Sequence, residues 1–345
     1  MKPKFLATAG VIAVALLFAA VPGLVGFSEA RQPKINHEQV IEAGFQEAEK
    51  ILVSGNAEHG MRSLANWLNM QPEVRRATLI GNDITVWFTD GYGIILLDLD
   101  LINQMVMPSW GAMSRVYPAG TPSQKTAIIT DALEWQGWSP ASIINPIIQD
   151  LNSAGYSVTY VKNEAADLKY IEANHNKGVI YHRGHGGVFE DASGSELVVL
   201  ETGEKWVDNN GDGKPDGSEY EWDRGWIFKG GISHGGTTYY FICYGPGLIS
   251  GYCSNLPDSL VYMTSCDGTH NPTMADAYLG AGAKAYVGWN KPVTVNHGNK
   301  WAVEDFDMFC AKGYSVQQVV DNTPRDGWPY RAKLTYYGDG SLTLT

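Results

Sequence analysis

The sequence predicts an α/β fold with a mostly parallel sheet, preceded by a small α+β region. From residue 124 onward, short apolar runs alternate with segments whose apolar residues recur at helical spacing. Strands that alternate with helices along a chain form βαβ units and therefore a parallel sheet. The length of 345 residues suits two domains, and 44% apolar residues supply material for their cores.

The strands and helices of this sheet can be placed from the same runs. A helix is predicted from an N-cap at Ser139 and a first helical residue at Pro140 to Gly155. Further helices are predicted over 167–173, 274–279 and 297–312. Strands are predicted over 126–130, 156–161, 179–182, 260–264, 285–289 and 333–337, with a long insertion over 188–258.

Residues 31–123 are expected to form an accessory domain or a pro-segment made of helices and hairpins. Apolar residues recur at helical spacing over 36–70, and apolar runs separated by glycine-containing turns follow over 74–101. Prolines and glycines over 103–123 indicate a linker, which places a domain boundary near Ser123.

The N-terminal 1–30 have the pattern of a secretory signal peptide. Lys2 and Lys4 precede an apolar run over 5–21, and small residues near Ala30 provide a cleavage site. Cleavage there predicts a secreted protein, extracellular or periplasmic, without stable membrane insertion afterwards. The alternative is an uncleaved membrane anchor, because the apolar run is nearly long enough to span a bilayer.

The charge of the chain bears on its partners. The net charge is −12, and no block of Lys and Arg is long enough to form a basic face. This predicts that nucleic acid is not a partner. An acidic surface attracts basic peptides and divalent cations instead, and the sequence leaves the oligomeric state open.

The chain has four cysteines, and even numbers outside the cytosol usually indicate disulfides. Cys243 and Cys253 lie ten residues apart and could close a loop. If they pair, Cys266 and Cys310 remain, and the surroundings of Cys266 indicate that it stays a thiol.

Two glycine-rich polar turns directly follow predicted strands, and one holds His185 while the other holds Cys266. The carboxyl ends of parallel strands meet at one edge of a sheet, where active sites lie. An imidazole beside a thiol can take its proton and produce a nucleophilic thiolate. The backbone N–H groups of Gly186 and Cys266 could donate to a developing oxyanion.

Other interpretations of these residues remain open. His182 and His185 are three residues apart and could be a metal pair or two structural histidines. Cys266 could be a buried cysteine or half of a disulfide.

Three stretches carry a resemblance to a known family. Residues 179–186 (VIYHRGHG) and 260–268 (LVYMTSCDG) resemble the two motif strands of the caspase–legumain–gingipain clan of cysteine peptidases. Residues 275–289 are similar to the helix and strand that follow in gingipain-type members. The resemblance implies a caspase-like three-layer sandwich over 124–345.

The resemblance also implies roles for single residues. The family places its catalytic histidine directly before a glycine, which selects His185 over His182. Cys266 is then the nucleophile, no third catalytic residue is required, and the substrate is a protein or peptide. The loop after the fifth strand would line the substrate pocket, which makes Trp289 and Asn290 candidates.

Asp267 is a third candidate for the substrate pocket. An acidic pocket residue would select Arg or Lys before the cleaved bond. The alternative is a turn residue that bonds its own backbone.

Residues 208–219 satisfy the spacing of an EF-hand calcium loop. Gly213 occupies the sixth position, where the loop turns sharply, and Lys214 offers its carbonyl at the seventh. A strand-like segment precedes the loop, so it is EF-hand-like and not part of an EF-hand pair. The alternative is a polar surface turn without a metal. The side-chain oxygen ligands would be Asp208, Asn210, Asp212, Asp216 and Glu219.

Together these features predict a secreted cysteine endopeptidase with a His–Cys dyad and calcium as a structural cofactor. Calcium is expected to order the insertion over 188–258. One alternative is an inactive secreted calcium-binding recognition or adhesion module on the same fold. Another is a Cys–His transpeptidase.

Overall fold

The computed structural model describes residues 35–345 apart from 54–59, 98–119, 139, 235–236 and 328–329. The predicted signal peptide over 1–30 and most of the predicted linker over 103–123 lie outside the described residues. Asn36–Thr345 forms one compact unit. Within the described ranges, no helix is both long and apolar enough to cross a lipid bilayer.

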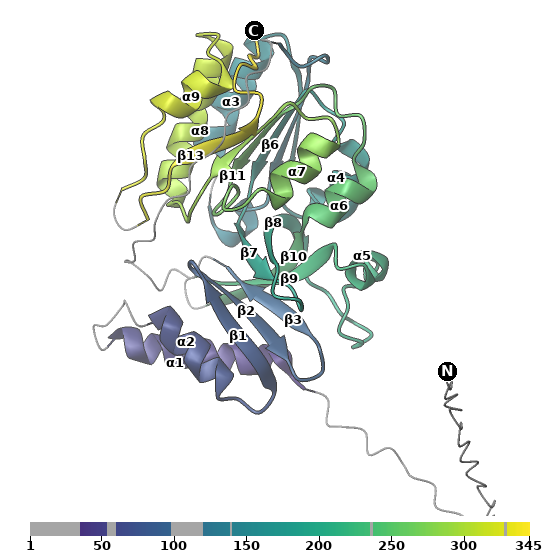
Figure 1. Cartoon of the computed structure of the whole chain (residues 1–345), viewed down its shortest axis with the longest axis vertical. Helices are drawn as coiled ribbons and strands as arrows, with labels where there is room; N and C mark the ends of the chain where they lie inside the picture. The colour runs from purple at the N-terminus through teal and green to yellow at the C-terminus, as the bar shows by residue number, and fades with distance from the viewer. Residues whose placement is uncertain (1–34, 54–59, 98–119, 139, 235–236, 328–329) are drawn as a thin grey trace, which may run out of the picture. The chain divides into compact units, whose positions relative to one another are not determined.

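A six-stranded sheet is built from the part of the chain after residue 124 (Figure 1). Its strand order is β13-β12-β11-β6-β4-β5, and all neighbours are parallel except β12 and β13. Every strand bound lies within one residue of the prediction. The strands are β4 Thr126–Asp131, β5 Ser157–Lys162, β6 Val179–Arg183, β11 Leu260–Thr264, β12 Ala285–Trp289 and β13 Leu334–Gly338.

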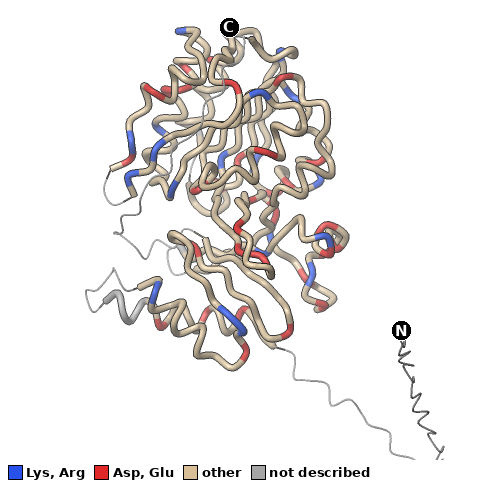
Figure 2. The backbone as a smooth tube through the Cα atoms, viewed as in Figure 1, with Lys and Arg blue, Asp and Glu red and all other residues tan. Residues whose placement is uncertain are grey.

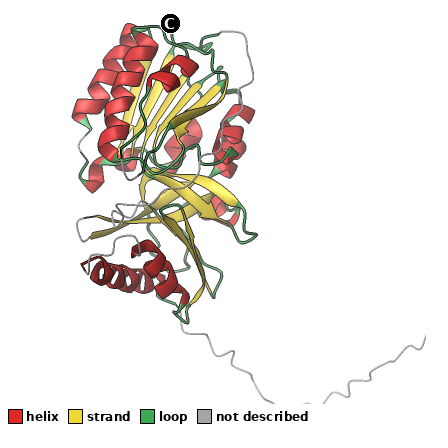
Figure 3. Ribbon diagram, turned by 60° about the vertical axis from the view of Figure 1, so that its left-hand side comes forward, coloured by secondary structure: helices red, strands yellow, loops and turns green. Residues whose placement is uncertain are grey.

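Helices cover both faces of this sheet (Figures 1 and 3). One layer holds α3 (Ala141–Ser153), α8 (Val295–Cys310) and α9 (Val316–Asn322), and the other holds α4 (Leu168–Asn174), α6 (Pro246–Tyr252) and α7 (Thr273–Gly280). The predicted fold class is confirmed, since a mostly parallel sheet between two helical layers is consistent with a caspase-like α/β fold.

The start of α3 differs from the prediction by one position. Pro140, predicted as the first helical residue, precedes the helix as its N-cap and makes no side-chain hydrogen bond to it. Ser139, the predicted cap, lies outside the described residues.

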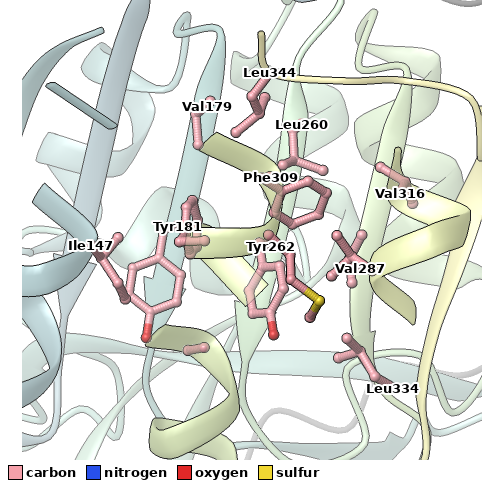
Figure 4. Close-up of a cluster of buried hydrophobic side chains, with 14 of the residues drawn as sticks. Ile147, Val179, Tyr181, Leu260, Tyr262, Val287, Phe309, Val316, Leu334 and Leu344 are labelled. Carbon is pink, nitrogen blue, oxygen red and sulfur yellow. The ribbon is translucent and has the colours of Figure 1, made fainter. Parts of the chain in front are cut away.

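Alternate residues along each strand pack against opposite helical layers. Tyr181 and Tyr262 belong to the cluster that includes Phe309 of α8 (Figure 4). Their neighbours in sequence, Ile180 and Val261, belong to the cluster formed with α4, α6 and α7. Burial of such side chains contributes about 1.5–3 kcal/mol each, so both layers fix the position of the sheet's carboxyl edge.

A second sheet joins the N-terminal region to the insertion. Its order is β1-β2-β3-β9-β10-β8-β7, and β3 pairs in parallel with β9. The helices α1 (His37–Val53) and α2 (Gly60–Asn69) precede it, and α5 (Glu219–Asp223) lies between β8 and β9. The strands are β1 Val74–Ile80, β2 Asp83–Phe88, β3 Gly93–Leu96, β7 Gly186–Glu190, β8 Glu196–Lys205, β9 Ile227–His234 and β10 Thr237–Tyr244.

None of the four cysteines, all within the described ranges, forms a disulfide. The pairing of Cys243 with Cys253, which the sequence left possible, is not formed. Cys243 packs in a cluster with the apolar side chains of β3 and β9, whereas Cys253 packs beside the helices α4, α6 and α7. The two thiols thus pack in two different hydrophobic clusters.

Candidate active site

The register of β6 and β11 brings His185 and Cys266 to the same edge of the sheet. The last residues that pair between these strands are Arg183 and Thr264. His185 and Cys266 each follow two residues later. Both line one small pocket, together with residues of the loop that follows β12 and of α8. The structure therefore brings the predicted dyad together.

The imidazole of His185 is enclosed by aromatic and polar neighbours. Its exposed fraction is 3%. The ring of Trp138 meets it edge-on at 5.3 Å between centroids, and Phe241 of β10 stacks at 6.2 Å. Its Nε2 atom lies 2.9 Å from Oε1 of Gln136, in the short helical turn η2 (Glu134–Gln136) after β4. These contacts fix the orientation of the ring.

A buried carboxylate, Glu201 of β8, lies behind the histidine. Its Oε2 accepts the backbone N–H of His185 at 2.9 Å, and its Oε1 accepts Nε2–H of Gln136 at 2.5 Å. Burial raises the pKa of Glu201 to about 7, and the His185 ring opposes this rise. The sequence interpretation missed Gln136 and Glu201. The only available signal for Glu201 was an acidic residue directly after the apolar run over 197–200.

Cys266 is held by the loop that follows β12. Its exposed fraction is 5%. The backbone N–H of Val293 donates to its Sγ at 3.3 Å, and the Cys266 thiol reaches the carbonyl oxygen of Val293 at 3.6 Å. The next residue, Thr294, donates its N–H to Asp326 at 2.7 Å and its hydroxyl at 3.2 Å. Asp326 thus anchors the loop that covers the thiol.

A buried ion pair supports the pocket from below. Arg183, the last residue of β6, donates from Nη1 to Asp131 at 2.6 Å, and both side chains are fully buried. Its Nε donates to Asn299 of α8 at 3.0 Å, and Asn299 lines the pocket. Burial raises the pKa of Asp131, and the guanidinium opposes that rise. The ion pair links β4, β6 and α8 beneath the dyad.

The backbone N–H of Gly186 points away from the neighbouring strand. Gly186 lies opposite Leu200, and the N–H of Glu201 donates to the carbonyl of His185. Gly186 and Leu200 are therefore a non-hydrogen-bonded pair of the antiparallel ladder, in which the N–H groups of both residues face away from each other. The predicted oxyanion donor is therefore not used within the pairing of β7 and β8.

Gly186 also allows a close approach of two backbones. A Cβ atom at this position would lie 2.5 Å from the carbonyl oxygen of Cys266 and 3.0 Å from Cβ of Ser265. Real Cβ atoms do not come so close to backbone, so only glycine fits between the turns that hold His185 and Cys266.

The three residues predicted to line a substrate pocket do not line this one. Trp289 is fully buried in the core beneath α8. The side chain of Asn290 accepts the backbone N–H of Lys333 at 2.9 Å. Asp267 has a positive φ of 53° and pairs with His270 at 3.5 Å, which agrees with the alternative of a turn residue.

His182 lies one residue before the end of β6 and is buried. Its Nδ1 lies 2.9 Å from the hydroxyl of Thr130, and burial lowers its pKa to about 4. Among the described residues, no group of three or more His, Cys, Asp or Glu side chains is arranged to hold a metal ion. The position of His182 favours the structural alternative for this residue.

The loop over 208–219 folds around the carboxylate of Asp208. Acidic and basic positions lie together in this part of the chain, near α5 (Figure 2). The carboxylate of Asp208 accepts the backbone N–H groups of Gly211 at 2.6 Å, Asp212 at 3.1 Å and Gly213 at 2.9 Å. Gly213 has a positive φ of 85°, as the sharp turn at the sixth position requires.

The other predicted calcium ligands differ in the hydrogen bonds that they make within the loop. Asn210 and Asp212 accept the N–H groups that lie two residues further on, at 2.8 and 2.9 Å. Asp216 accepts hydrogen bonds from the backbone N–H and the side-chain amide of Asn209, and Glu219 is the first residue of α5. The ammonium group of Lys214 pairs with Asp223 at 2.6 Å. The candidate calcium ligands are hard oxygen atoms of the kind that calcium prefers. In the described structure, however, the carboxylates of this loop accept N–H groups and are not arranged as a group that holds a metal ion.

Comparison with known proteins adds a distant likeness only. No protein-family model matches this chain, and no curated protein matches it. Among solved structures, the Arg-specific cysteine proteinase gingipain R is similar to it, with a TM-score of 0.39 and 13% identity. The similarity covers 64% of this chain and 48% of that chain, about half its length. The function is therefore inferred from the residues of this chain.

Proposed function

We propose that the protein is a secreted cysteine endopeptidase with His185 and Cys266 as its catalytic dyad. One observation carries the proposal: two adjacent parallel strands end at the same level, and the residues that follow them line one pocket. A thiol and an imidazole in a shared pocket are the groups that thiol-dependent acyl transfer needs.

In the proposed reaction, His185 takes the proton of the Cys266 thiol, and the thiolate attacks the carbonyl carbon of the peptide. The C–N bond breaks, and the leaving amine receives the proton from His185. Water then hydrolyses the thioester, with His185 as base, and the thiol returns. The N–H groups of Gly186 and Cys266 are the proposed donors to the oxyanion.

The test is hydrolysis of a fluorogenic peptide library by the purified protein, with reductant and calcium present. We expect turnover that Cys266→Ala and His185→Ala each abolish. Cys253→Ala should retain it, since burial raises the pKa of that thiol to about 12 and leaves it unreactive. Absence of turnover, with Cys266 inert to a thiol probe, would contradict the proposal in favour of the recognition or adhesion module.

A transpeptidase is separated by its product. If the protein is a hydrolase, the free acid should remain the main product when a dilute amine nucleophile is added. Accumulation of an amide of the added amine would identify a transferase that uses the same dyad.

The loop over Cys266 leads to a prediction about thiol reactivity. Asp326→Ala removes the anchor of Thr294, and a hydrogen bond to a charged group contributes about 1.5–3 kcal/mol. Alkylation of Cys266 by iodoacetamide should therefore become at least about tenfold faster. Asp321→Ala, at an exposed position of α9, should leave the rate unchanged. Equal rates in both variants would show that the loop does not restrict the thiol.

We also propose that calcium binds the loop over 208–219 and stabilises the insertion. Calcium that binds the folded state alone stabilises it by about 2.7 kcal/mol at a concentration of 100 times Kd. The melting temperature should therefore rise with added calcium and fall with a chelator.

Two isosteric variants test the calcium site. Asp212→Asn keeps the oxygen that accepts the N–H of Lys214 but removes one ligand charge, so it should weaken the response to calcium. Asp223→Asn, outside the loop, should keep the response. A melting temperature independent of calcium in the wild-type protein would exclude a structural calcium site.

A further inference from the structure

Gln136 bridges Glu201 and His185 by both ends of its amide. Its Nε2 lies 2.5 Å from Glu201 Oε1, and its Oε1 lies 2.9 Å from His185 Nε2. The exposed fractions of Glu201, Gln136 and His185 are 0%, 2% and 3%. Because burial excludes water, the donor and acceptor roles in this chain must be complementary.

The roles follow from the carboxylate. Ionised Glu201 only accepts hydrogen bonds, so the NH₂ end of the Gln136 amide must face it. The oxygen end then faces His185 and can only accept. His185 Nε2 must therefore carry the ring proton, which leaves Nδ1 as the basic nitrogen of the neutral imidazole.

We propose that Glu201 is a positioning residue: through the Gln136 amide, it keeps the proton of neutral His185 on Nε2 and so makes Nδ1 the catalytic base. The inference rests on the proposed function, because the choice of base matters only if Cys266 is the nucleophile. Glu201 also accepts the backbone N–H of His185, so it holds the turn as well as the ring.

Protonation of Glu201 reverses the chain of hydrogen bonds. Its O–H then donates to Gln136 Oε1, and the Gln136 NH₂ group donates to Nε2 of His185. The ring proton moves to Nδ1, and the base is lost. In total one proton is taken up from solvent, and it resides on Glu201.

Several charged or titratable groups surround Glu201. His185 lowers its pKa, Asp131 of β4 raises it, and Arg183 neutralises Asp131. Cys243 of β10 is a further titratable group near the Glu201 carboxyl, and the His182 ring of β6 interacts with the backbone of Glu201. Burial is the largest influence and raises the pKa to about 7, so the reversal should occur near neutral pH.

The test is nitrogen NMR of the protein labelled with ¹⁵N-histidine, carrying Cys266→Ala so that the readout does not depend on activity. At pH 8 the ring of His185 should be protonated on Nε2, and the protonated nitrogen should change to Nδ1 as the pH falls through about 7. Proton on Nδ1 at pH 8 would overturn the proposal. This titration needs no variant of the relay itself.

Two variants make the test sharper. In Glu201→Gln, the new NH₂ group donates to Gln136, whose own NH₂ must turn to His185, so the proton should lie on Nδ1 at every pH. The double variant Glu201→Gln with Gln136→Glu exchanges the two groups and should return the proton to Nε2. In proteins with Cys266 intact, loss of the general base should lower turnover by about 100-fold or more in the single variant, and turnover should recover in the double variant.

The outcomes separate this inference from the proposed function. The expected NMR pattern without any turnover would retain the relay and reject the peptidase. Turnover that depends on Cys266, with an unchanged tautomer in Glu201→Gln, would retain the peptidase and reject the relay.

Discussion

Replacement of Arg183 by Met is expected to lower the free energy of unfolding by about 3–5 kcal/mol. The guanidinium is fully buried and donates to Asp131, to Asn299 and to the carbonyl of Trp138. The variant leaves the Asp131 carboxyl buried without its counter-charge, which is the costly way to break an ion pair. Urea denaturation measures the loss directly.

The loss of unfolding free energy in Arg183→Met should increase with pH. Without Arg183, only the hydrogen bonds from the Leu133 N–H and the Tyr160 hydroxyl still oppose the effect of burial on Asp131, so the pKa of its carboxyl rises further. A carboxyl whose pKa is higher in the folded state than in the unfolded state costs stability as the pH rises, because ionisation then favours unfolding. The difference between variant and wild type should therefore be larger at pH 8 than at pH 6.

Two controls separate charge from volume in this prediction. The double variant with Asp131→Leu as well should recover most of the stability, since apolar residues can replace a buried pair. Lys205→Met breaks an ion pair with Glu164 whose side chains are 48% and 67% exposed, so it should cost no more than about 1 kcal/mol. If Arg183→Met lowered the free energy of unfolding by no more than Lys205→Met does, the buried ion pair would contribute little to stability.

The sheet and the dyad could be predicted from sequence because both depend on local patterns. Short apolar runs that end in glycine-rich turns define the strands, and parallel strands place their carboxyl ends together. The two turns meet because β6 and β11 pair in parallel, which is a tertiary pairing that the structure shows. The final strand was predicted near its observed position, but its antiparallel direction beside β12 had no local signal.

The surroundings of the dyad could not be predicted, because they depend on tertiary pairing. Glu201 reaches His185 because β8 returns antiparallel beside β7, and Val293 reaches Cys266 because Asp326 holds its loop. Trp289 was expected in the pocket, but alternation along β12 directs its side chain into the core. Neither the pairing of strands within the insertion nor the path of that loop has a local signature.

The substitution Gly186→Ala should reduce turnover about 100-fold or more, because a displacement of about 1 Å can cost that much. The added Cβ would lie 2.5 Å from the carbonyl oxygen of Cys266, so the backbones of the turns that hold His185 and Cys266 must move apart. The change removes neither the imidazole nor the thiol. Its effect therefore reports how closely the two turns have to approach.

Gly280→Ala is the matched control, since a Cβ at that position of α7 meets nothing within 4 Å. Alanine is favoured over glycine in a helix, so this variant should keep full turnover and equal or greater stability. Circular dichroism and urea denaturation of Gly186→Ala should show a folded protein, so that the loss of turnover can be assigned to the site. If folded Gly186→Ala kept wild-type turnover, the proposed dyad would tolerate separation of the turns that hold His185 and Cys266.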